Sequence, residues 1–198
     1  MADHYYTQNP GAARDERTID IAVRGISLRL TTDSGVFSKG GLDYGSRFLI
    51  ECLEWSPGAR VLDVGCGYGP IGLAVAKLDP SARVTMLDIN ERAVELARRN
   101  ARSNGLPNAE ALASDRLSAV AGREFDVVVT NPPIRAGKSV VHAIFEEARD
   151  KLVPGGSLWI VIQKKQGAPS AKARLEELYA SVEEVGKDKG YRVFKAIK

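Results

Sequence analysis

Residues 60–72, Arg-Val-Leu-Asp-Val-Gly-Cys-Gly-Tyr-Gly-Pro-Ile-Gly, decide the fold of this chain. An apolar run leads into alternating glycines, and an apolar helical pattern begins at Pro70. This order predicts a strand, a tight loop and a helix of an α/β domain. Glycines at positions 65, 67 and 69 allow the backbone to approach a ligand and to adopt dihedral angles that other residues avoid.

The ligand of this loop is predicted from its charged and proline positions. Gly67-x-Gly69-x-x-Gly72 matches the dinucleotide fingerprint, which alone is weak evidence. Asp63 would repel a pyrophosphate, and Pro70 has no N–H to donate to a phosphate. S-adenosylmethionine (SAM) has no phosphate, and an acid favours its cationic amine and sulfonium. We therefore predict a SAM site; the alternatives are NAD or another nucleotide, and a plain strand–helix turn.

Apolar segments alternate with helical patterns along the rest of the chain. Strands are expected near 60–64, 83–88, 110–113, 125–130 and 157–163, and helices near 70–78, 91–103, 139–151 and 169–180. Residues 182–197 predict a closing hairpin, residues 19–30 predict an N-terminal hairpin, and residues 43–53 predict a helix. The short spacings suit right-handed β-α-β crossovers. The expected fold is α/β: a Rossmann-like, seven-stranded, mostly parallel sheet with helices on both faces, plus an N-terminal β-hairpin and helix.

Polar residues follow several of these strands directly. Gly65, Asp88, Asp115 and Asn131 each come just after an apolar run, and the carboxyl ends of parallel strands meet at one edge of the sheet. We expect Asp88 to accept hydrogen bonds from ribose hydroxyls, Ile89 to pack on adenine, and Asp115 to accept from the adenine amine. The alternatives are a helix cap for Asp88 and a solvated turn for Asp115. The residues expected to bind SAM are Asp63, Gly65, Cys66, Gly67, Gly69, Asp88, Ile89, Asp115, Arg116 and Asn131.

The corner Asn131-Pro132-Pro133-Ile134 predicts the chemistry. An exocyclic amine on a base is a poor nucleophile because its lone pair is delocalised into the ring. Asn131 Oδ1 and the Pro132 carbonyl can each accept one N–H, which aims the lone pair at the methyl group. Asn131 and Pro132 are therefore the expected catalytic residues, and a plain turn is the alternative.

Composition agrees with a compact enzyme. The chain has 198 residues, 44% of them hydrophobic and 27% charged, which predicts one domain with a substantial core. No apolar run approaches the ~20 residues that cross a bilayer, and the N-terminus has no signal pattern. Two cysteines form neither a disulfide framework nor a metal cluster. We expect a cytoplasmic protein with no membrane segment and no metal; the oligomeric state is left open, and a monomer is one alternative.

The charge distribution bears on the partner. The net charge is +3, and residues 161–198 hold nine Lys or Arg against five acids. Such a segment favours phosphate and therefore RNA; a solvated surface is the alternative.

Several motifs resemble those of class I SAM-dependent methyltransferases: Asp63-Val-Gly-Cys-Gly-Tyr-Gly69, Asp88 and Asn131-Pro-Pro133. Segments 32–39, 42–46, 131–138 and 163–170 are similar to the "small" methyltransferase domain group, which includes bacterial small-subunit (16S) rRNA guanine-N2 methyltransferases. The resemblance spans about residues 4–198. It implies a single methyltransferase domain over 1–198, with residues 1–55 covering the site and residues 58–198 forming the core.

The resemblance implies methyl transfer from SAM to the exocyclic N2 amine of guanine in small-subunit rRNA. A base within a duplex would have to be flipped out. Many amine methylators have an aromatic residue where this chain has Ile134, so Phe37 or Tyr44 is expected to stack on the base instead. The alternatives are a protein glutamine N-methyltransferase, a small-molecule methyltransferase and a non-catalytic SAM-binding module. The expected substrate-binding residues are Phe37, Lys39, Tyr44, Pro133, Ile134, Arg135, Lys138, Lys164 and Lys165.

Overall fold

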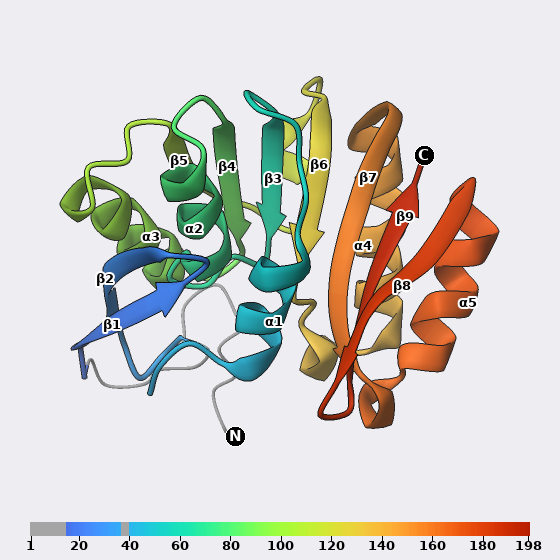
Figure 1. The fold of residues 1–198 in the computed structure, drawn as a ribbon, viewed down its shortest axis with the longest axis horizontal. Coiled ribbons are helices and arrows are strands. Elements are labelled where there is room, and N and C mark those ends of the chain that lie inside the picture. The colour runs from blue at the N-terminus through green and yellow to red at the C-terminus, as the bar shows by residue number, and fades with distance from the viewer. Residues whose placement is uncertain (1–14, 37–39) are drawn as a thin grey trace.

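The computed structural model describes residues 15–36 and 40–198. Its main sheet has seven strands in the order β5-β4-β3-β6-β7-β9-β8 (Figure 1). The strands from β5 to β7 run parallel, while β9 and β8 complete the sheet in antiparallel pairing. The strands are β3 (Arg60–Val64), β4 (Arg83–Asp88), β5 (Ala109–Ala113), β6 (Phe125–Thr130), β7 (Leu152–Gln163), β8 (Ser181–Asp188) and β9 (Tyr191–Ile197).

Helices cover both faces of this sheet, because successive strand residues point to opposite sides. Val61 belongs to one hydrophobic core and its neighbour Leu62 to the other. The first core lies under α1, α2, α3 and the hairpin of β1 and β2, and the second lies under α4 and α5. These elements are β1 (Arg17–Val23), β2 (Ile26–Thr32), α1 (Tyr44–Cys52), α2 (Pro70–Leu78), α3 (Glu91–Ser103), α4 (Lys138–Lys151) and α5 (Ala168–Leu178). The predicted α/β fold is confirmed.

Asn100 of α3 and Asn104, the residue that caps this helix, attach the N-terminal hairpin to the rest of the molecule. Asn100 exchanges hydrogen bonds with the backbone N–H and C=O of Thr31, at 2.8 and 2.9 Å. One turn later, Asn104 does the same with Arg29, at 3.1 and 2.9 Å. Their side chains satisfy the backbone groups on the free edge of β2, as a further strand would. Asn100 Nδ2 also donates to the carbonyl of Tyr68 at 2.9 Å, which joins the hairpin to the glycine loop.

The strand order creates a site at one edge of the sheet. β3 lies between β4 and β6, so the chain leaves β3 toward one side and later returns to its other side. The helices that follow β3 and β6 diverge from this point, which opens a crevice at the carboxyl ends of the strands.

One strand begins earlier than the sequence predicts. β7 starts at Leu152, whereas the pattern indicates a strand from 157. Pro154-Gly155-Gly156 is typical of a turn, yet here it forms an irregularity in the ladder between β6 and β7. A Cβ on Gly156 would lie 2.9 Å from the carbonyl oxygen of Val153, so only glycine fits there. Among residues 15–36 and 40–198, no helix combines the length and apolar character needed to cross a bilayer.

Candidate active site

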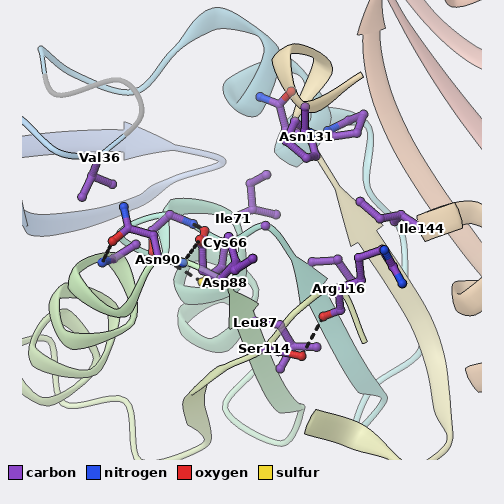
Figure 2. A pocket seen from close by; sticks show the side chains of 18 of the residues that line it. Val36, Cys66, Ile71, Leu87, Asp88, Asn90, Ser114, Arg116, Asn131 and Ile144 are labelled. Carbon is purple, nitrogen blue, oxygen red and sulfur yellow. Dashed lines mark hydrogen bonds between the residues drawn. The ribbon is translucent and has the colours of Figure 1, made fainter. Parts of the chain in front are cut away.

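A cavity of about 360 Å³ lies at the carboxyl ends of β3, β4, β5 and β6 (Figure 2). The cavity is lined by the residues that directly follow each of these strands, so positions far apart in sequence meet here. The alternation of strands and helices along the chain predicts this arrangement. The polar and backbone lining comes from Asp43, Ser46, Gly65, Cys66, Gly67, Tyr68, Asp88, Asn90, Ser114, Asp115, Arg116, Asn131, Pro132 and Pro133. The apolar lining comes from Val36, Val64, Pro70, Ile71, Leu87, Ile89, Ala93, Ala136, Val140 and Ile144.

The glycine loop forms the floor of the cavity. Gly65 and Gly67 have φ values of 73° and 57°, in the left-handed region that favours glycine. The N–H groups of Gly65 and Cys66 donate to the Leu87 carbonyl at 2.8 and 2.9 Å. A Cβ on Gly65 would meet no atom within 4 Å, so this glycine leaves open space at the cavity floor.

The last two glycines of the motif serve helix packing. Gly69 caps α2 with a φ of 97°, and a Cβ there would lie 2.9 Å from Leu73 Cδ1. A Cβ on Gly72 would lie 2.6 Å from Met86 Cγ. Gly69, predicted to bind the cofactor, does not line the cavity; it and Gly72 let α2 lie close to β4.

Asp63 lies beneath the loop and is fully buried. Its Oδ2 accepts a hydrogen bond from the N–H of Gly72 at 2.9 Å, and Oδ1 has no hydrogen-bond partner among the described residues. Burial raises the pKa of Asp63 to about 7, with a smaller contribution from nearby Asp88. Asp63, expected among the SAM-binding residues, is therefore not among the residues that line the cavity.

Asp88 organises the wall between β4 and α3. Its Oδ2 accepts from the N–H of Gly67 at 2.8 Å, and its Oδ1 accepts from the N–H of Asn90 at 2.9 Å. Burial raises the pKa of Asp88, while these backbone hydrogen bonds oppose the shift. Asn90, rather than Asp88, caps α3, accepting from the N–H of Arg92 at 3.0 Å. The Asp88 oxygens still have lone pairs available to a ligand, because each carboxylate oxygen can accept two hydrogen bonds.

The loop after β5 contributes two charged residues of opposite sign. The side chain of Asp115 is 67% exposed. Arg116 has a φ of 48°, and its Nε donates to Glu147 Oε1 on α4 at 2.5 Å. Arg116 pairs with Glu147 and also lies 4.0 Å from Asp115 Oδ1. The three acids of the lining, Asp43, Asp88 and Asp115, outnumber its single arginine.

Asn131 extends from the end of β6 into the cavity wall (Figure 2). Its Nδ2 donates to Ser46 Oγ at 3.1 Å and to Asp43 Oδ2 at 3.3 Å, both at the start of α1. Pro133 has φ −75° and ψ 80°, an inverse γ-turn in which the N–H of Ile134 donates to the Pro132 carbonyl at 2.9 Å. That carbonyl keeps a second lone pair for another donor.

The expected substrate-binding residues do not all lie at the cavity. Pro133 lines the cavity, whereas Ile134, Arg135 and Lys138 lie beside it, in the 3₁₀ turn η2 (Ile134–Ala136) and at the start of α4. Lys164 and Lys165 are exposed in η3 (Lys164–Gln166), just after β7. Phe37 and Lys39 lie outside the described residues.

Tyr44, expected as an alternative to Phe37 for stacking on a base, does not line the cavity. Its hydroxyl donates to Asp188 Oδ2, and its ring packs against Phe48 and Tyr191. Asp188 and Tyr191 place Tyr44 against the hairpin of β8 and β9.

Five polar lining residues were missed from the sequence: Asp43, Ser46, Tyr68, Asn90 and Ser114. Tyr68 is only 2% exposed, and its hydroxyl donates to the Gly41 carbonyl at 3.4 Å. The start of α1 carries a recognisable signal, since Asp43 accepts from the N–H of Ser46 as an N-cap. Nothing in that local pattern indicates a contact with Asn131. Within the described part of the chain, no group of three or more His, Cys, Asp or Glu side chains is arranged to hold a metal ion.

The chemistry of the lining selects among ligands. An acidic cavity whose arginine is already paired would repel a pyrophosphate, and Pro70 begins α2 without an N–H to donate. A cationic ligand without phosphate, able to donate hydroxyl hydrogen bonds to Asp88, fits these residues.

The comparisons with known proteins agree with this geometry. The sequence model described as "Methyltransferase small domain" matches residues 27–195. The protein of Bacillus subtilis (strain 168) named Uncharacterized protein YbxB is 50% identical over 201 residues, and the match covers all of both chains. The Streptomyces avermitilis Ribosomal RNA large subunit methyltransferase G is 35% identical, and the match covers 98% of this chain and 53% of that protein.

Among solved structures, the T. thermophilus 16S rRNA N2 methyltransferase RsmC, in complex with AdoMet (SAM) and guanosine, superposes with a TM-score of 0.84 at 30% identity. The superposition covers 96% of this chain and 52% of that one. The chain thus spans about half the length of the rRNA methyltransferases it matches.

Proposed function

Because this chain belongs to the methyltransferase small domain family, we propose that it transfers the methyl group of SAM to the exocyclic N2 amine of a guanine in ribosomal RNA. The observation that carries the proposal is Asn131, whose side chain lies in the wall of the acidic cavity that the glycine loop floors. The RsmC structure, which contains AdoMet and guanosine and aligns over 96% of this chain, supports both ligands.

The cavity residues fit SAM by charge and by shape. Bound SAM supplies an electrophilic methyl group on a sulfonium. Gly65 leaves open space above the loop, and Asp88 offers carboxylate lone pairs to hydroxyl donors. Asp115 gives a further acceptor at the end of β5. Buried Asp63 adds negative potential beneath the loop whenever it is ionised.

The Asn131 corner provides the acceptor for the amine. Asn131 Oδ1 and the free lone pair of the Pro132 carbonyl each accept one N–H of the incoming amine. Holding both hydrogens fixes the direction of the nitrogen lone pair and stabilises the positive charge that develops on nitrogen. The gain comes from orientation and preorganised dipoles. The new N–C bond replaces the S–CH3 bond of SAM, which leaves as S-adenosylhomocysteine. The methylated nitrogen then carries a positive charge and releases one proton to water, so no strongly basic side chain is required.

A basic edge beside the cavity suits an RNA partner. We define it as Arg135, Lys138, Lys164, Lys165 and Lys189. The N–H of Lys164 donates to the carbonyl of Gly190 at 2.8 Å, so η3 lies against the turn between β8 and β9. Figure 1 shows this turn and the end of β6 at the same end of the sheet. Phosphates of a bound RNA could therefore contact these cations while one base enters the cavity.

Small-subunit rRNA is the proposed substrate, and the test separates it from the other candidates. Protein is incubated with tritiated SAM and, separately, with unmodified small-subunit rRNA, large-subunit rRNA, each ribosomal subunit and a ribosomal protein fraction. Labelled RNA is then digested to nucleosides. The expected product is N2-methylguanosine from small-subunit rRNA or its subunit. Label in large-subunit rRNA would correct the target. Label in glutamine of the protein fraction, or no label despite SAM binding, would overturn guanine methylation.

A further inference from the structure

The side-chain amide of Asn131 is held from outside its own corner. Its partners, Asp43 and Ser46, lie 88 and 85 positions earlier in the chain, at 3.3 and 3.1 Å from Nδ2. All three residues line the same cavity. The Oδ2 atom of Asp43 also accepts from the N–H of Ser46 at 2.9 Å. The same oxygen atom therefore caps α1 and accepts the hydrogen bond from Asn131.

These contacts select one orientation of the amide. A carboxylate can only accept hydrogen bonds, whereas an amide has a donor end and an acceptor end. Rotating the Asn131 amide by half a turn would set Oδ1 against the Asp43 carboxylate, with repulsion between two acceptors. Nδ2 therefore faces Asp43, and Oδ1 is left for an incoming donor.

We propose that Asp43 and Ser46 are positioning residues, which fix the Asn131 amide so that its oxygen receives the substrate amine. The inference rests on the proposed function, because it assigns a task to residues that act through Asn131. A hydrogen-bond acceptor that is already oriented lowers the barrier of methyl transfer more than a freely rotating one, because it needs no rearrangement at the moment of reaction. The start of α1 thereby becomes part of the methyl-transfer site, although no residue of the Asn-Pro-Pro corner lies on that helix.

Serine and aspartate have different shares in this task. The Ser46 hydroxyl can donate or accept, so it steadies the amide without choosing its orientation. The Asp43 carboxylate, which can only accept hydrogen bonds, determines which end of the Asn131 amide faces α1. Asp43→Asn preserves the helix cap, because Asn and Asp are equally good N-caps, but permits either orientation of Asn131.

A reciprocal exchange tests the proposal. Asn131→Asp places two carboxylates together and should slow single-turnover methyl transfer by about 100-fold or more. The double variant Asn131→Asp with Asp43→Asn restores a donor facing an acceptor, and it restores the net charge of the site. It should transfer methyl groups at least ~10-fold faster than Asn131→Asp alone, a coupling that a double-mutant cycle measures. Calorimetry with SAM checks that every rate is measured at saturation.

Additive losses in the two variants would overturn the proposal, because a role confined to capping α1 predicts no mutual rescue. The matched control is Asp79→Asn in the loop between α2 and β4, at the end of the sheet opposite the cavity. There Asp79 accepts from the N–H of Gly58 at 3.1 Å. It should leave the rate of transfer unchanged.

A second measurement requires no substrate. The side-chain ¹⁵N–¹H₂ signal of Asn131, assigned by its loss in Asn131→Ala, should shift in Asp43→Asn and in Ser46→Ala but not in Asp79→Asn. Should wild-type protein methylate no RNA, the proposed function fails while this spectrum still tests the contact. An Asn131 signal that is identical in wild type and Asp43→Asn would refute the positioning role.

Discussion

At the scale of single residues, Asp88 serves both the loop and the ligand. It lines the cavity and accepts from the N–H groups of Gly67 and Asn90, and its oxygens can accept further hydrogen bonds. We predict that Asp88→Ala weakens SAM binding by about 1–3 kcal/mol, the scale of a lost hydrogen bond to a charged acceptor. Asp115→Ala should weaken SAM binding by less, because the Asp115 side chain is 67% exposed and its charge is screened by solvent. Titration calorimetry gives both values, and equal losses would contradict this ranking.

The buried acid beneath the loop predicts a pH dependence of stability. The pKa of Asp63 is raised from 3.8 to about 7 by burial, so the folded protein holds a proton that the unfolded chain releases between these values. The free energy of unfolding should therefore fall as pH rises from about 4 to about 7, as far as Asp63 contributes.

Comparison with Asp63→Asn isolates this contribution. Asparagine can still accept from the N–H of Gly72 but cannot ionise. Urea unfolding at pH values from 4 to 8 should show the variant gaining stability relative to wild type as pH rises, with the difference levelling above the folded pKa. Parallel curves across this range would show that Asp63 does not titrate as its burial requires.

At the scale of elements, close packing of α2 on β4 sets the position of the glycine loop. A Cβ on Gly72 would lie 2.6 Å from Met86 Cγ and 3.2 Å from Asp63 Oδ2. Gly72→Ala should destabilise the fold by about 1–3 kcal/mol, because the helix must move away from the strand. Thermal and urea unfolding measure the change. Gly40→Ala is the control, since a Cβ there meets nothing within 4 Å. A Gly72→Ala protein as stable as that control would exclude the packing role.

The sequence also predicts the helices and strands better than it predicts individual side-chain contacts. Apolar runs before Gly65, Asp88, Asp115 and Asn131 indicate parallel strands, and parallel strands bring their carboxyl ends to one edge. That topological rule is independent of the separation along the chain, so the shared cavity follows from periodicity alone. The early start of β7 was not predicted, because Pro154-Gly155-Gly156 has the composition of a turn and the ladder irregularity depends on pairing with β6.

Contacts between side chains could not be predicted in the same way. The glycine motif does not distinguish Gly65, which leaves open space at the cavity floor, from Gly72, which faces Met86 on the neighbouring strand. Tyr44 is aromatic and near the site in sequence, yet its partners Asp188 and Tyr191 come from the end of the chain. The bond between Asn131 and Asp43 likewise depends on how α1 docks, which no local pattern encodes.

At the scale of the whole molecule, the basic edge predicts salt-dependent binding of RNA. Lys164 and Lys165 are exposed beside the turn of β8 and β9. Reversing both charges, Lys164→Glu with Lys165→Glu, should weaken RNA binding and flatten its dependence on salt concentration, because fewer counterions are released. SAM affinity should stay unchanged. Filter binding of rRNA at several salt concentrations provides the slopes.

The matched control reverses two charges at the opposite edge of the sheet. Lys77 lies in the last turn of α2 and Arg83 begins β4, and both are exposed. Lys77→Glu with Arg83→Glu changes the net charge equally but should have a smaller effect on RNA affinity. Equal weakening by the two double variants would mean that overall charge, rather than the basic edge, governs RNA binding.

The most direct test of the account is single-turnover methyl transfer by Asn131→Ala, with SAM saturating and with the RNA that the wild-type protein labels. SAM affinity and the unfolding curve are measured on the same preparation, so that a binding or folding defect cannot imitate a chemical one. The account predicts nearly wild-type SAM binding and stability with a rate of transfer lower by about 100-fold or more, the usual cost of deleting one preorganised polar group at a reacting centre. Transfer at the wild-type rate would contradict it, and the corner after β6 would then be only a turn.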